Sequence, residues 1–201
     1  DPQEFEPGVI SGERVQKLAE AWGVLHGEDV ILMPARLTEW KGQGVLIEAL
    51  ALLRDRADTG WICVLAGPEG DRKFSRRLQQ RVRELGLEDR VRFAGTCTDM
   101  PAACDLANVV VAPSLRPEPF GRTLVEAQMM GRPVIGTAQG AMMETILPGE
   151  TGLVVPPGDA EALAEALKTI LLMDWDTQDR MMDKARTHAV AHYTTALMQS
   201  R

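Results

Sequence analysis

Short apolar runs and amphipathic stretches alternate along most of the chain. The runs are bounded by glycine, proline or polar residues, a pattern typical of buried strands in a parallel sheet. Between them, apolar residues recur at spacings of three and four, which predicts helices with one buried face. We expect strands at 30–33, 61–66, 91–93, 109–112, 134–136 and 153–155. We expect helices at 11–22, 43–56, 73–85, 100–106, 121–130, 143–146, 159–172 and 176–198, with Ser11 and Asp159 as caps.

This alternation predicts an α/β fold, a Rossmann-like doubly wound parallel sheet with flanking N- and C-terminal helices. Residues 1–29 are expected to form an extended lead-in and a first helix, 30–173 the sheet domain, and 174–201 a C-terminal helix. Ligands of such sheets bind at the carboxyl ends of the strands, so the loops that follow the strands are where a site is expected.

Composition narrows the functional classes. The 201 residues fit one domain, and a net charge of −7 argues against a nucleic-acid partner. The cysteines, Cys63, Cys97 and Cys104, show no paired spacing, so neither a disulfide framework nor a zinc site is indicated. Reduced cysteines fit a cytoplasmic location. No apolar segment has the length of a membrane span, and no signal peptide is visible.

The most informative stretch is 115–133, a proline-rich loop and a helix that follow the expected strand at 109–112. The loop carries Glu118 and the helix carries Glu126. A helix N-terminus offers unpaired N–H groups to an anion, whereas a carboxylate accepts hydrogen bonds from hydroxyl groups. Together they suit a ligand with both phosphate and hydroxyl groups, such as a sugar nucleotide. The alternative is that Glu118 caps a helix and Glu126 lies on a solvated face.

The same stretch resembles the donor-binding signature of retaining glycosyltransferases of the GT4 family, also called group 1, which have the GT-B fold. The resemblance lies in Arg-Pro-Glu-Pro-Phe-Gly at 116–121, Leu-Val-Glu-Ala at 124–127 and Met-Gly-Arg-Pro-Val-Ile at 130–135. It implies that Glu118 holds sugar hydroxyls and that Glu126 binds the ribose. It also implies donor contacts at the start of the helix, from Phe120, Gly121, Arg122, Thr123 and Leu124.

Three other loops match this family. Arg36 and Lys41 follow the first strand. The planar guanidinium of Arg36 and the compact ammonium charge of Lys41 suit a diphosphate. The resemblance implies that they hold the donor's diphosphate and stabilise the leaving group, so Arg36, Lys41 and Glu118 are the expected catalytic residues. Gly67 follows the second strand and is expected near the donor. Gly95 and Thr96 follow the third, where the family loop packs by the nucleotide base.

Two other motifs are not interpreted as sites. Asp174-Trp175-Asp176 has the form of a metal-binding motif, but it lies between two helices, so we expect a connector and a helix cap. His26, His188 and His192 are scattered in the sequence, and structural roles are expected for them. No metal site is therefore predicted.

The resemblance covers about 30–193 and implies the C-terminal, donor-binding domain of a retaining glycosyltransferase, with a UDP-, GDP- or ADP-sugar as donor and no metal. Polysaccharide or lipopolysaccharide synthesis is the setting it suggests. The acceptor would bind mainly to an N-terminal domain absent from this chain. Any peripheral association with the inner face of the membrane would also be made by that N-terminal domain. We expect the chain to be inactive alone. The alternatives are a sugar-nucleotide epimerase or phosphorylase of the same architecture, or a non-catalytic nucleotide-sugar-binding module.

Overall fold

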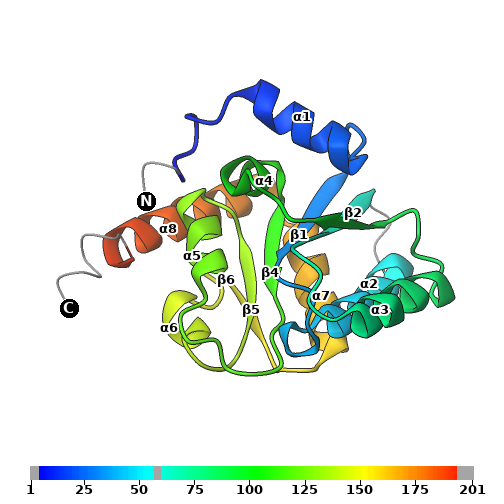
Figure 1. Ribbon diagram of the computed structural model, residues 1–201. Helices are drawn as coiled ribbons and strands as arrows, with labels where there is room; N and C mark the ends of the chain where they lie inside the picture. Colours follow the sequence, from blue (N-terminus) through cyan, green and yellow to red (C-terminus); the bar gives the residue numbers. More distant parts are fainter. Residues whose placement is uncertain (1–4, 57–59, 194–201) are drawn as a thin grey trace.

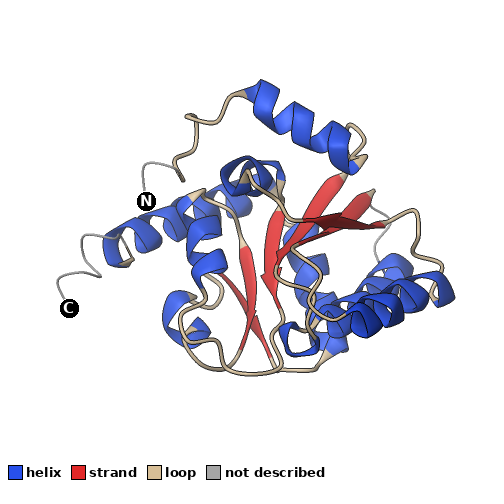
Figure 2. Cartoon of the chain, in the orientation of Figure 1, coloured by secondary structure: helices blue, strands red, loops and turns tan. Residues whose placement is uncertain are grey.

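The computed structural model describes residues 5–56 and 60–193, in which a six-stranded parallel sheet lies between two layers of helices (Figure 1, Figure 2). Its strands are β1 (Asp29–Pro34), β2 (Trp61–Ala66), β3 (Val91–Gly95), β4 (Val109–Ala112), β5 (Val134–Thr137) and β6 (Gly152–Val155). Their order is β3-β2-β1-β4-β5-β6. The chain therefore reverses its direction of winding between β1 and β4, and this is where a doubly wound sheet opens a crevice for ligand.

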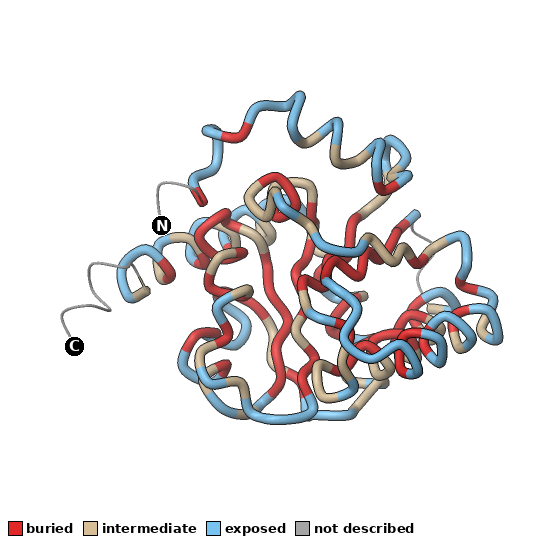
Figure 3. Tube along the Cα trace, in the orientation of Figure 1, coloured by how far each residue is buried: buried red, intermediate tan, exposed pale blue. Residues whose placement is uncertain are grey.

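Alternate residues of the strands feed two separate apolar layers. In β1, Ile31 and Met33 face one layer, and Val30 and Leu32 face the other. Strands buried on both faces explain the continuous apolar runs of the sequence. Figure 3 shows these buried strands at the centre of the molecule, whereas most of the first helix is exposed.

The helices divide between the two faces of the sheet. One layer is covered by α2 (Gln43–Arg56), α3 (Arg72–Glu84) and α7 (Ala160–Leu171). The other is covered by α1 (Gly12–Trp22), α4 (Met100–Leu106), α5 (Arg122–Met129) and α8 (Trp175–His192). The short α6 (Met142–Thr145) follows β5. The predicted α/β Rossmann-like fold is confirmed.

Every predicted strand and helix is present, most of them within one or two residues of the expected ends. Ser11 accepts from the backbone N–H of Arg14, and Asp159 accepts from that of Ala162, so both predicted caps are confirmed. The motif at Asp174 is a cap as well, because its carboxylate accepts from the N–H of Thr177 at the start of α8.

Two predictions at the chain ends were wrong. Residues 5–8 form a bend and a turn rather than an extended lead-in, because Phe5 and Ile10 both bury their side chains in the second apolar layer. The last helix was expected to reach residue 198, but α8 ends at His192, and Tyr193 has a non-helical φ of −128°. The rest of that predicted helix lies outside the described residues.

The flanking segments belong to the same core as the sheet. Trp22 of α1 and Ala189 of α8 are buried in the layer that also holds Val30 and Leu32 of β1. The three expected segments at 1–29, 30–173 and 174–201 therefore pack as parts of one apolar core over their described residues.

Candidate functional site

A cleft of about 470 Å³ opens at the carboxyl ends of β1, β2 and β3, between the starts of α4 and α5. The loops after these strands contribute Arg36, Gly67 and Thr96. The first turns of α5 contribute Arg122, Thr123 and Glu126. Six of the predicted site residues are thus brought together from four separate parts of the chain.

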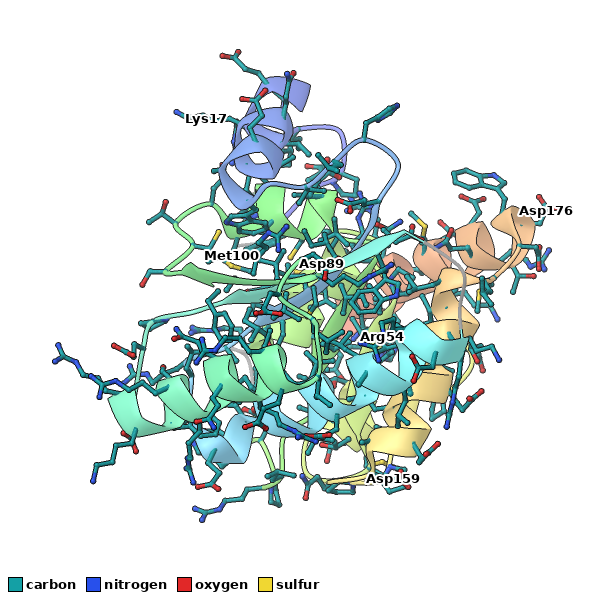
Figure 4. The ribbon with its side chains drawn as sticks, turned by 90° about the vertical axis from the view of Figure 1, so that its right-hand side faces the viewer. Lys17, Arg54, Asp89, Met100, Asp159 and Asp176 are labelled. Carbon is teal, nitrogen blue, oxygen red and sulfur yellow. The ribbon has the colours of Figure 1, made fainter. Side chains whose placement is uncertain are left out.

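Other residues of the cleft were not predicted to bind the donor. They come from the lead-in, from the ends of β1 and β2 with their loops, and from the segment that runs from the β3 loop into α4. They are Phe5, Pro34, Ala35, Ala66, Pro68, Cys97, Thr98, Met100 and Pro101. Met100, labelled in Figure 4, is the first residue of α4. The apolar character of several of these residues gave no chemical signal in the sequence, because core residues have the same composition.

Hydrogen bonds between loops fix the positions of the cleft residues. The β1 loop pairs with the β2 loop, through Ala35 N–H to the Ala66 carbonyl (3.1 Å) and Leu37 N–H to the Pro68 carbonyl (3.0 Å). It also pairs with the β4 loop, because Leu115 N–H donates to the carbonyl of Trp40 (2.7 Å). The sheet's pairing thus continues beyond its strands, and Arg36 lies on the central one of the three loops.

Glycines allow the three loops to approach this closely. A Cβ on Gly67 would lie 2.0 Å from the carbonyl oxygen of Ala35. A Cβ on Gly42, whose φ is +85°, would lie 1.9 Å from the carbonyl oxygen of Pro113. No real side chain tolerates such contacts, so each glycine is required by packing and, at Gly42, by backbone conformation as well.

Lys41 and Glu118 form a second cluster outside the lining of the cleft. Lys41 Nζ lies 2.5 Å from Glu118 Oε1, and the hydroxyl of Ser114 donates to the same oxygen at 2.7 Å. Both charged side chains are mostly buried, with 22% and 12% of their surfaces exposed. Lys41 Nζ also lies 4.2 Å from the ring centroid of Trp40. The β1 and β4 loops are therefore joined by an ion pair as well as by the backbone.

Ser114 is a member of this cluster that the sequence analysis did not single out. It is fully buried, and its carbonyl accepts hydrogen bonds from Thr137 Oγ1 (3.1 Å) and Gln139 Nε2 (2.7 Å). Its hydroxyl is thereby held toward Glu118. The available signal was its position two residues beyond a buried strand, at the edge of the sheet where ligands bind.

The N-terminus of α5 is open toward the cleft. Gly121 precedes the helix with a φ of +67°, and no side chain caps the first turn. Arg122, 81% exposed, lies one turn before Glu126, with Nε and Oε1 3.9 Å apart. Free N–H groups and the helix dipole favour an anion at this position.

The remaining predicted donor-binding residues lie around the cleft rather than in its lining. Gly95 ends β3 with a φ of +67°. The ring of Phe120 packs edge-on against Tyr193, with the centroids 6.1 Å apart. The side chain of Leu124 is fully buried in the second apolar layer and so faces away from solvent.

Two of the three histidines lie side by side. His188 and His192 are one turn apart on α8, with ring centroids 4.6 Å apart, and both lie near Tyr193. Burial and the neighbouring His192 lower the pKa of His188. No group of His, Cys, Asp and Glu side chains suited to a metal ion occurs among residues 5–56 and 60–193.

Comparison with known proteins identifies the family. The model of the family described as "Glycosyl transferases group 1" matches residues 15–188. The chain belongs to this family. D-inositol 3-phosphate glycosyltransferase of Corynebacterium glutamicum is 33% identical over 193 residues, which are 94% of this chain and 45% of that protein. The chain therefore spans about half the length of this curated relative.

Two solved structures of this glycosyltransferase architecture have closely similar folds. A glycosyltransferase from Rickettsia africae superposes with a TM-score of 0.95 at 30% identity, over all of this chain and 52% of that one. HepE of Anabaena, crystallised with UDP and glucose, superposes with a TM-score of 0.89, also at 30% identity, over all of this chain and 53% of that one. The fold is thus the Rossmann-like half of a GT-B glycosyltransferase.

None of the helices in the described residues has both the length and the hydropathy of a membrane span.

Proposed function

We propose that this chain binds the sugar-nucleotide donor of a retaining glycosyltransferase, with the cleft at the carboxyl edge of the sheet as the nucleotide site. The observation that carries the proposal is the convergence on that cleft of Arg36, the open N-terminus of α5 and Glu126. A helix N-terminus is complementary in charge to a diphosphate, and a carboxylate is complementary in hydrogen bonding to ribose hydroxyls. HepE, which has the same fold and was crystallised with UDP and glucose, supports the choice of a nucleotide and a sugar as ligands.

The main predicted residues then divide the parts of the donor among them. Arg36 binds the diphosphate with the first-turn amides of α5, and Glu126 accepts hydrogen bonds from the ribose hydroxyls. Glu118 lies in the neighbouring cluster with Lys41, next to the diphosphate site, and binds hydroxyls of the sugar. Gly67 permits close approach of the β2 loop, and Gly95 with Thr96 adjoins the base.

The reaction breaks the bond between the sugar's anomeric carbon and the diphosphate oxygen, and the nucleoside diphosphate leaves. The proton of the acceptor hydroxyl passes to the departing diphosphate, and the acceptor oxygen forms the new glycosidic bond with retained configuration. Lys41, Arg36 and the α5 dipole stabilise the leaving diphosphate, so the site can work without a metal ion. The acceptor belongs to the N-terminal domain of the complete enzyme, and polysaccharide or lipopolysaccharide synthesis is the proposed setting. Any membrane association belongs to that other half too.

Separate substitution of the two glutamates tests this assignment. Glu126→Ala should weaken the nucleoside diphosphate and the sugar nucleotide equally, because the ribose is common to both. Glu118→Ala should weaken only the sugar nucleotide. Each loss should be about 1.5–3 kcal/mol, as is typical of hydrogen bonds to a charged group. Calorimetric titration of UDP, GDP, ADP and their sugar conjugates measures both effects.

Two further variants serve as controls. Glu118→Gln keeps an acceptor for Ser114 but removes the charge that pairs with Lys41, and it separates loss of the ion pair from loss of the side chain. Glu144→Ala removes an exposed glutamate of α6 outside the cleft and should leave binding unchanged. Equal losses for both ligands in Glu118→Ala would show that Glu118 does not bind the sugar.

A further inference from the structure

We propose that Phe5, from the segment that precedes α1, is part of the nucleotide-binding surface and contacts the base. The proposal rests on the proposed function, because it adds a residue to the same cleft. Phe5 lies at the wall of that cleft although it is separated in sequence from every other residue of the lining.

The lead-in segment is held against the domain. The N–H of Val9 donates to the carbonyl of Glu6 (3.3 Å), which closes a turn. Glu6 lies 3.6 Å from Arg186 of α8, and Arg186 in turn donates to the carbonyl of Met129 at the end of α5 (2.7 Å). Phe5 is therefore positioned by contacts that reach both α5 and α8.

The apolar part of the cleft offers a surface that suits an aromatic ligand. Arg36 and Arg122 suit the charged groups of a nucleotide, and Glu126 suits its ribose hydroxyls. Phe5, Met100 and Pro101 offer apolar surface, and Phe5 is the one aromatic side chain among the described residues of the lining. A nucleobase is the part of the donor that has a π face, and such a ring gains most from an edge or face contact with another aromatic ring. Phe5, Cys97 and Met100 also pack in one apolar layer, so this surface is continuous.

Phe5 has two natural controls in this chain. Ile10 belongs to the same segment and the same apolar layer and is 9% exposed, but it is outside the lining of the cleft. Phe74 has the same 7% exposure as Phe5 but belongs to α3 and the opposite layer. An effect specific to the cleft therefore has to distinguish Phe5 from both.

The direct test is fluorine NMR of the otherwise native protein labelled with fluorophenylalanine, titrated with UDP, GDP and ADP. The resonance of Phe5, assigned with Phe5→Leu, should shift on saturation with whichever nucleotide binds, and that of Phe74 should stay in place. A bound nucleotide that leaves the Phe5 resonance unmoved would overturn the inference while the proposed function stands. If none of the three nucleotides binds, the proposed function falls, and the inference falls with it.

Affinities of two conservative variants give the second test. Phe5→Leu keeps apolar volume but removes the ring, and it should weaken nucleotide binding about three- to tenfold. Ile10→Val should leave affinity unchanged although it also perturbs the lead-in. Equal weakening in both variants would mean that the segment acts through stability alone, and the inference would be wrong. If Phe5→Leu does not fold, the fluorine experiment decides.

Discussion

Arg36 and Lys41 are five residues apart in one loop, yet they occupy different surroundings. Arg36 lines the cleft, whereas Lys41 is paired with Glu118 and mostly buried. A cation pattern in a sequence predicts charge near a phosphate, but it does not show which cation another loop already engages. That information lies in the β4 loop, which lies more than seventy residues away in the chain.

Substitution of these cations tests their role at the diphosphate. Arg36→Ala and Lys41→Ala should each weaken nucleoside diphosphate binding by about 1.5–3 kcal/mol, and the effect of Arg36→Ala should shrink at high salt. Lys17→Ala is the matched control, since Lys17 is exposed and projects from α1 (Figure 4). Calorimetry at two ionic strengths measures the losses. Unchanged affinity in both variants would place the diphosphate elsewhere.

Cys97 offers a chemical probe of the same cleft. Burial raises the pKa of its thiol, and burial raises the pKa of Cys104 to about 12 and that of Cys63 even further. Because the thiolate is the reactive form, alkylation should be slow at neutral pH and faster as the pH rises. Cys63 and Cys104 are fully buried, so iodoacetamide should modify Cys97 first, and bound nucleotide should slow it.

Peptide mapping by mass spectrometry locates the modification, and Cys97→Ser provides the unlabelled control. Comparable labelling of Cys63 in the folded protein, or a Cys97 rate indifferent to saturating nucleotide, would contradict this expectation.

At the scale of helices and strands, the sequence predicted the features that depend on interactions between neighbouring residues. Apolar periodicity and capping residues such as Asp159 placed the helices, because a cap and a buried face act over a few residues. The lead-in was mispredicted because its turn is set by distant contacts of Phe5 and Ile10 with the second apolar layer. Six of the predicted site residues converge on the cleft because parallel strands end at one edge of the sheet. Phe5 and Ser114 were not singled out, because their positions depend on contacts between segments that are far apart in the sequence.

The end of α8 should respond to pH through His188. Its ring lies near those of His192 and Tyr193, and its pKa is lowered from the ordinary 6.5 by burial and by His192. A group with a lowered folded pKa takes up its proton more readily in the unfolded chain. Its stabilising contribution is therefore present above about 6.5 and is lost as the pH falls through the folded value.

Thermal unfolding between pH 8 and 5 measures this dependence. His188→Gln should lose less stability on acidification than the native protein does. His26→Gln, which changes a histidine of the loop between α1 and β1, should behave like the native protein. If the stability of His188→Gln and of the native protein depended identically on pH, His188 would not contribute to the acid response.

For the whole molecule, the described residues build a cleft at the carboxyl edge of the sheet. The family relative is about twice as long as this chain. We expect the chain to bind nucleotide but not to transfer sugar at an appreciable rate, because it spans only about half of that relative and the acceptor is proposed to bind to the other half. Release of nucleoside diphosphate from each sugar nucleotide, with and without candidate acceptors, measures this. Robust transfer by the chain alone would show that it carries its own acceptor site.

The close packing of the loops around Gly42 and Gly67 also determines how this domain can be re-engineered. One route to exchange donor preference with a relative is to graft a single loop. Here the β1 loop shares backbone hydrogen bonds with both the β2 and β4 loops, and a Cβ added at Gly42 would lie 1.9 Å from the carbonyl oxygen of Pro113. A transplanted 35–42 segment would meet foreign neighbours on both sides. The unit of exchange is therefore the three loops together, with their glycines, rather than any one of them.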